Sequence, residues 1–96
     1  MKAMLITFDI IPGKQSDFEA AVSFHVNNVR ARDPNYSFYS LTRDRDMETR
    51  YILMQQFKSW EAQLAHQTYD YVLDAMPAMN ACIAGPPTID WLEVVI

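Results

Sequence analysis

Four short runs of apolar residues along the chain have the composition of β-strands. They are rich in β-branched and aromatic residues, and turn-forming residues border them, with Pro12-Gly13 after the first run and Gly85-Pro86-Pro87 before the last. The expected strands are residues 3–11, 35–43, 49–57 and 88–96. The charged residues 43–48 are expected to form a solvated hairpin connection between the second and third strands.

The segment between the first two expected strands has the periodicity of an amphipathic helix. Apolar positions recur at intervals of three and four residues, at Phe18, Val22, His25 and Val29. Ser16 and Glu19 have the spacing of a capping box, which predicts Ser16 as the N-cap. Asp33 is expected to end the helix, because Pro34 disfavours helical backbone in the residue before it.

A second helix is expected over about residues 60–75, with Ser59 as its N-cap. Its apolar side is expected to carry Ala62, Ala65, His66, Tyr69 and Leu73. Pro77 should break or kink this helix, because proline lacks the amide hydrogen that a continuing helix needs. A short helical piece is expected to follow through Ile83.

The predicted element order is β-α-β-β-α-β, which is typical of the ferredoxin-like α+β fold. The connection rules then give a four-stranded antiparallel sheet with both helices on one face. Residues 1–96 form a single expected domain. Both faces of the strands are apolar, however, and two helices can cover only one of them. A second copy of the sheet would cover the other face, so we expect a homodimer.

Composition and charge narrow the classes of protein. Half of the residues are hydrophobic and 21% are charged, which is typical of a globular chain. A net charge of −4 offers no basic patch for nucleic acid. No apolar run has the length of a membrane span or the pattern of a signal peptide, and the single cysteine, Cys82, cannot form an intrachain disulfide. We therefore expect a cytoplasmic protein that binds neither nucleic acid nor membranes.

The two histidines of the chain, His25 and His66, both fall on the predicted helix faces that pack against the sheet. Each could be a hydrogen-bonded core residue. Alternatively, the two rings could line one cavity, where burial tunes a proton acceptor near neutral pH. We name His66 and His25 as candidate catalytic residues. No metal site is expected, because two histidines far apart in sequence have no accompanying carboxylate or cysteine at ligand spacing.

Aromatic residues are numerous for a chain of this length, and most must belong to the core or to a dimer interface. Some could form the walls of a pocket for a flat ring. The candidate substrate-binding residues are Phe57, Tyr39, Tyr51 and Tyr69.

Several motifs together resemble the antibiotic biosynthesis monooxygenase family. They are PGK after the first strand, TRYILMQQF followed by SWEAQLAH, and AGPP before the last strand. The most specific is Glu61-Ala62-x-Leu64-x-His66, which looks like the start of the helix that carries a histidine in the family. The resemblance covers essentially the whole chain. It implies a dimeric α+β barrel, and for some members oxidation of quinols or polyphenols by dioxygen without a cofactor.

The sequence departs from the family pattern at three positions. Phe57 stands where the oxygenases often have tryptophan, Gln55 where glutamate is common, and Tyr71 where a second histidine follows the first. Breakdown of haem, which some members perform, is therefore disfavoured, and we expect no cofactor. The 15-residue spacing between Arg50 and His66 is similar to that in the branch that degrades the signalling sugar autoinducer-2.

Three functions follow as hypotheses. The first is a cofactor-independent monooxygenase for a small electron-rich phenol or quinol, with His66 as base or orienting group and His25 as a polar contact. The second is an isomerase or lyase for a small carbonyl compound or signalling sugar, which would use the histidines to move protons. The third is a non-catalytic dimeric module that binds a small ligand.

Overall fold

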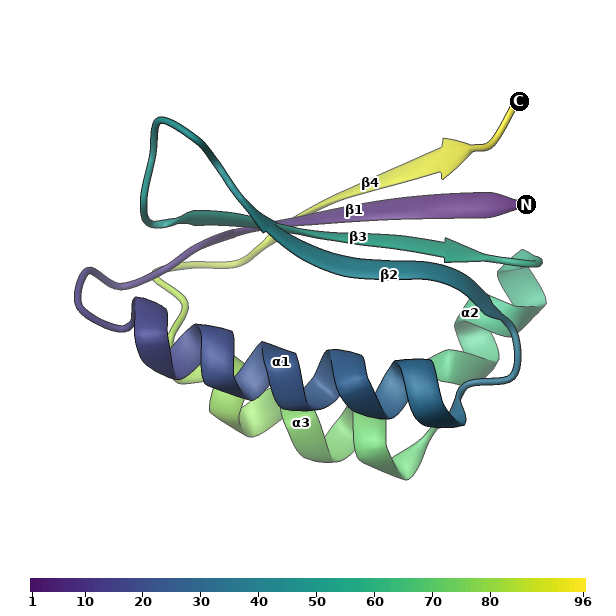
Figure 1. Ribbon diagram of the computed structural model, residues 1–96, viewed down its shortest axis with the longest axis horizontal. Coiled ribbons are helices and arrows are strands. Elements are labelled where there is room, and N and C mark those ends of the chain that lie inside the picture. The colour runs from purple at the N-terminus through teal and green to yellow at the C-terminus, as the bar shows by residue number, and fades with distance from the viewer.

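The computed structural model describes residues 1–96 and contains one antiparallel sheet of four strands, as Figure 1 shows. The strands are β1 (Lys2–Asp9), β2 (Tyr36–Arg43), β3 (Arg50–Phe57) and β4 (Thr88–Glu93). Their order across the sheet is β2-β3-β1-β4, so β2 and β4 form its edges. This arrangement confirms the predicted ferredoxin-like α+β fold. The first and last strands are shorter than predicted at their C-terminal ends.

Three helices lie on one side of the sheet: α1 (Gln15–Arg32), α2 (Trp60–His66) and α3 (Asp70–Asn80). The long helices α1 and α3 run side by side beneath the strands, while α2 lies at the end of the sheet where β3 finishes (Figure 1). None of the three combines the length and apolar character that crossing a bilayer requires.

The predicted capping box at the start of α1 is wrong. The helix begins two residues earlier than predicted, at Gln15, and no side chain caps it at Lys14. Instead, the Gln15 side chain accepts a hydrogen bond of 2.8 Å from the Gly13 amide. The Glu19 carboxylate does not reach back to Ser16, because it accepts a hydrogen bond from the Tyr51 hydroxyl.

The single helix predicted over residues 60–75 is two helices. Its predicted N-cap is confirmed, since the Ser59 hydroxyl accepts a 3.1 Å hydrogen bond from the Ala62 amide. The break falls at residues 67–69, whereas Pro77 lies inside α3. A proline there leaves the carbonyl of Leu73 without its usual partner, and Leu73 is half exposed, so water can reach it. Leu73 therefore does not continue the buried stripe of α2.

The main core lies between the helices and the sheet. Residues on β3 alternate strictly, with Tyr51, Leu53, Gln55 and Phe57 buried against the helices. Phe18, Val22 and Val29 on α1 are fully buried against them, as the predicted stripe requires. This packing fixes which side chains of the sheet can face a site between the two layers.

The opposite face of the sheet is also apolar and carries no helix (Figure 1). Leu5, Ile52 and Met54 are only partly buried there, and Phe38 and Leu92 are exposed. Edge strand β4 is exposed along its whole length. The two-faced pattern inferred from the sequence is thus present, and the homodimer stays a prediction.

Candidate active site

A cavity of about 550 Å³ lies between the helices and the sheet, and we call it the inner cavity. Every strand and helix of the fold contributes to its wall. Most of its lining is apolar, including Val72 and Met76 from α3 and Ile89 and Trp91 from β4. Its polar lining consists of histidine, tyrosine, glutamine and asparagine side chains, and no charged side chain lines it. Such a site suits an uncharged, largely apolar ligand.

His25 and His66 both line the inner cavity, so the two histidines share one site. His25 reaches it from the buried stripe of α1, and His66 reaches it as the last residue of α2. The side chains are 3% and 4% exposed, and their ring centroids lie 6.1 Å apart. The helix break after His66 ends α2 where this ring meets the sheet.

The Tyr39 hydroxyl on β2 lies between the two imidazoles. It is 2.9 Å from His25 Nε2 and 3.5 Å from His66 Nε2. One hydroxyl can donate its single proton to only one of them at a time. Tyr39 therefore couples the protonation of one histidine to that of the other.

Asp33 completes this polar chain from the far side of His66. Its Oδ2 lies 2.8 Å from His66 Nδ1, and its Oδ1 accepts a 2.9 Å hydrogen bond from the Asn35 amide. A carboxylate accepts hydrogen bonds, so Nδ1 of His66 carries the proton and Nε2 presents its lone pair toward Tyr39 and the cavity. This is the arrangement of an oriented general base.

The surroundings tune each of these groups. Burial, and to a smaller extent His66, lowers the pKa of His25 to about 4. Burial also lowers the pKa of His66, while the hydrogen bond and charge of Asp33 oppose that shift. Burial and then the charge of Asp33 raise the pKa of Tyr39. At neutral pH both histidines are therefore uncharged, and Tyr39 keeps its proton.

Three of the predicted aromatic residues lie outside this cavity. Phe57 is buried behind it and packs on the His66 ring at a centroid distance of 5.0 Å. Tyr69 stacks on Tyr71 between the helices, at 5.6 Å. Tyr51 packs on Phe18 in the core, farther along β3. Tyr39 is thus the one predicted substrate-binding residue that lines the inner cavity with the histidines.

Sequence reasoning missed Asp33, Gln55 and Gln63 as site residues. Asp33 was interpreted only as a helix terminator, although it is almost fully buried. Gln55 and Gln63 are 3% and 2% exposed and line the inner cavity. The strict alternation of β3 could have revealed Gln55, because it occupies the same face as Leu53 and Phe57.

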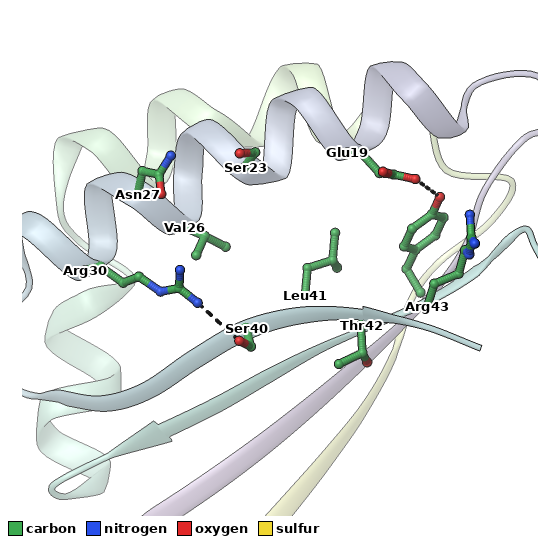
Figure 2. Close-up of a pocket in the computed structure, with 10 residues that line it drawn as sticks. Glu19, Ser23, Val26, Asn27, Arg30, Ser40, Leu41, Thr42 and Arg43 are labelled. Carbon is green, nitrogen blue, oxygen red and sulfur yellow. Dashed lines mark hydrogen bonds between the residues drawn. The ribbon is translucent and has the colours of Figure 1, made fainter. Parts of the chain in front are cut away.

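A second hollow, which we call the outer groove, lies between α1 and edge strand β2, with a volume of about 460 Å³ (Figure 2). Arg30 lies toward one end of it, and Arg43 and Glu19 lie at the other. Tyr51 also lines this groove and donates its hydroxyl proton to Glu19. Burial raises the pKa of Tyr51, whose hydroxyl bonds to Glu19. This groove offers no imidazole to accept a proton near neutral pH, so the inner cavity is the better candidate for acid–base chemistry.

The donor atoms do not suit a metal ion. No group of three His, Cys, Asp or Glu side chains lies close enough together to hold one. Behind the wall of the inner cavity, Asp33 and the protonated Nδ1 of His66 are already bonded to each other.

Fold and site together define a ferredoxin-like α+β domain with an apolar, histidine-lined cavity between its helices and sheet. The chain belongs to the antibiotic biosynthesis monooxygenase family, whose profile matches residues 1–78. Among curated proteins, none matches the sequence significantly.

Solved structures agree with this assignment. A candidate antibiotic biosynthesis monooxygenase from Caulobacter crescentus CB15 is 29% identical, with a TM-score of 0.94 over 99% of this chain and 90% of that chain. One from Nitrosomonas europaea is 16% identical, with a TM-score of 0.92 over the whole of both chains. One from Deinococcus radiodurans is 12% identical, with a TM-score of 0.88 over 100% of this chain and 94% of that chain. The last two show similarity of fold alone.

Proposed function

We propose that the protein is a cofactor-independent monooxygenase that oxidises a small, uncharged, electron-rich aromatic compound, a quinol or polyphenol, with dioxygen. The observation that carries this proposal is the buried Asp33–His66 pair, which presents an unprotonated imidazole nitrogen to an apolar cavity. Family membership supports the reaction class.

In the first step, His66 Nε2 accepts the proton of a phenol or of an acidic ring C–H group. The resulting imidazolium keeps its hydrogen bond to Asp33, whose negative charge stabilises it. The Tyr39 hydroxyl and His25 hydrogen-bond to the developing phenolate oxygen. A bound aromatic ring would displace water from the apolar walls, which strengthens these interactions and protects the anion from reprotonation by solvent.

The electron-rich anion then reacts with dioxygen at a ring carbon. For an anthrone-like substrate, that carbon forms a bond to one oxygen atom, and a proton returned by His66 gives a hydroperoxide. Loss of water from the hydroperoxide leaves a carbonyl group. The carbon has lost two hydrogens and gained one oxygen, and the second oxygen atom leaves as water, so atoms and electrons balance without another reductant.

The isomerase or lyase hypothesis draws support from the same pair of proton acceptors. A phosphorylated substrate, however, would have no anchor in this cavity, because no arginine or lysine lines the cavity. Arg50, the residue that suggested the signalling-sugar branch, instead forms an ion pair with Asp9 at 3.0 Å outside the cavity. An uncharged carbonyl substrate would remain compatible with the site.

We also propose that the protein acts as a homodimer. The uncovered face of the sheet, with Leu5, Ile52, Met54, Phe38 and Leu92, would be buried against the same face of a second copy. The inner cavity lies on the other side of the sheet, so each subunit would keep its own site.

The test measures oxygen uptake and the absorption spectrum with anthrone and a series of hydroquinones, in buffer containing EDTA. We expect substrate-dependent uptake of one dioxygen per anthrone and formation of the corresponding quinone. A wild-type protein that consumes no oxygen across the series contradicts the proposal. If that protein instead exchanges the α-hydrogens of small ketones with deuterated water, the isomerase hypothesis replaces it.

A further inference from the structure

Two polar atoms in the wall of the inner cavity are buried without a hydrogen-bond partner in the protein. They are His25 Nδ1 and Gln55 Oε1, on side chains that are each 3% exposed. Leaving a buried polar group unpaired costs free energy, and such groups in folded proteins usually bond to a ligand or to water. The mechanism above uses His25 but gives Gln55 no role.

The sheet places Gln55 close to the proton-transfer groups. On β3 it faces the helices together with Leu53, and its cross-strand neighbours are Tyr39 on β2 and Met4 on β1. Its amide is therefore next to the residue that contacts both histidines, in a row that is otherwise mostly apolar. A leucine at this position would fill similar space without the cost of burying an amide.

We propose that Gln55 determines the ligand specificity of the inner cavity: its amide binds a second hydroxyl group of an uncharged aromatic ligand whose first hydroxyl lies at His25 and His66. This inference rests on the proposed function for the role of the site, and it assigns to Gln55 the recognition of the second hydroxyl group that distinguishes a quinol or polyphenol from a monohydroxy aromatic.

The chemistry of the amide fits a hydroxyl group in either orientation. Oε1 accepts a hydrogen bond, and a hydroxyl donates one. If the amide nitrogen occupied this position instead, the buried atom would be an unpaired donor, and the same hydroxyl could accept from it. A hydroxyl can thus replace a water molecule at Gln55 without loss of hydrogen bonding, whereas a ring C–H cannot.

The remaining lining selects against charged ligands. A carboxylate or phosphate would enter a cavity without a single lysine or arginine in its wall. The flat ring would contact Val72, Ile89 and Trp91. Polar recognition then depends on few groups, so loss of one should change specificity measurably.

The experiment compares binding of 1-naphthol and 2-naphthol with binding of the dihydroxynaphthalene isomers. Isothermal titration calorimetry under nitrogen measures Kd without turnover. We expect the best dihydroxy isomer to bind wild-type protein about tenfold more tightly than either naphthol, which is the size of one well-formed neutral hydrogen bond. Gln55→Leu should abolish this preference while binding of the naphthols changes little.

Matched variants make the result specific. Gln56→Leu makes the same change one residue along β3, on the opposite face of the sheet and outside the cavity, and should keep the preference. Gln55→Met, of similar length and also apolar, serves if Gln55→Leu misfolds. Both Gln55 variants should melt at the same or a higher temperature than wild type, because they remove an unpaired buried group.

Three outcomes would overturn the inference. Wild-type protein could bind naphthols and dihydroxynaphthalenes with equal affinity, or bind none of them. The preference could also survive in both Gln55 variants. The inference about Gln55 and the proposed monooxygenase function can fail independently of each other. A Gln55-dependent preference in a protein that consumes no oxygen supports the inference alone. Oxygen uptake by a protein whose preference does not depend on Gln55 supports the monooxygenase alone.

Discussion

Asp33 Oδ2 lies 2.8 Å from His66 Nδ1, although the two residues are 33 positions apart along the chain, and both side chains are almost completely buried. Asp33 is placed by the end of α1, and His66 by the end of α2. Their hydrogen bond fixes the tautomer of the imidazole and supplies a negative charge for the imidazolium that proton transfer creates. The proposed chemistry of the inner cavity depends on this pair.

Asp33→Asn should lower kcat by at least about 100-fold while ligand binding changes little. Asparagine is similar in shape and can still accept from the Asn35 amide, but its NH₂ group would favour the tautomer of His66 with the proton on Nε2. Oxygen-uptake kinetics and calorimetric titration of a dihydroxynaphthalene measure the two effects. Unchanged kcat in a folded variant would remove Asp33 from the mechanism.

His66→Gln should suppress turnover without unfolding the protein. Glutamine can donate to Asp33 but cannot accept a proton near neutral pH. The free energy of unfolding should fall by at most about 3 kcal/mol, the upper end of the cost of a disturbed buried hydrogen bond. Thermal melts and oxygen uptake are measured on the same preparations.

The control for that variant is Phe57→Leu, which loosens packing behind the His66 ring but leaves the proton acceptors in place. It should lower stability and keep most of the turnover. If His66→Gln retains turnover, or if both variants lose activity only in proportion to their loss of fold, His66 is structural.

The predicted fold was accurate where one local pattern decided the outcome. The β3 alternation and the stripe of α1 both follow from periodicity and appear in the structure. Local signals failed where they competed with tertiary contacts. The Ser16–Glu19 capping box does not form, because the Glu19 carboxylate instead accepts a hydrogen bond from the hydroxyl of Tyr51, which is distant in sequence.

The site was only partly predictable for the same reason. The helical spacing placed His25 and His66 on faces toward the sheet, and they meet in one cavity. Asp33 gave no such signal, because an aspartate before a proline is fully explained by its local role of ending a helix. Tyr39 was predicted as a ring wall, whereas its hydroxyl lies between the two histidines, a placement that depends on the positions of β2, α1 and α2 in space.

Stability should fall as the pH decreases from about 6.5 toward 4. The pKa of His25 falls from 6.5, its ordinary value, to about 4 in the folded protein, and that of His66 is also lowered. The unfolded chain therefore binds more protons in this window, and acid favours it. Above pH 6.5 this contribution to stability is fully present.

Urea unfolding at pH 7 and pH 5 measures the effect, and His25→Phe provides the comparison because it removes one titrating group. The midpoint of the variant should depend less on pH than that of wild type. A variant with the same pH dependence would show that His25 does not titrate on unfolding.

The uncovered face of the sheet should hold a dimer. Sedimentation equilibrium at micromolar concentration should give twice the chain mass of 11.1 kDa. Leu92→Asp places a charge on that face and should yield monomers that aggregate, because an apolar sheet surface becomes exposed. Phe24→Asp, at a residue that is 71% exposed on α1, should leave the dimer intact. A wild-type monomer would contradict the homodimer.

Arg30 of the outer groove is bonded to the backbone of Tyr39, whose side chain lines the inner cavity. Arg30 donates to the Tyr39 carbonyl through two nitrogens, at 3.2 and 2.9 Å, and to the Ser40 hydroxyl on the same edge strand (Figure 2). The peptide group of Tyr39 is therefore held from the solvent side, while its hydroxyl contacts the histidines within. A fluorescent label, an affinity tag or an immobilising surface attached near Arg30 would pull on this carbonyl and shift the hydroxyl about one tyrosine length away. Chemical handles for this protein belong on the exposed connection between β2 and β3, at Arg45 or Asp46, which lines neither the outer groove nor the inner cavity.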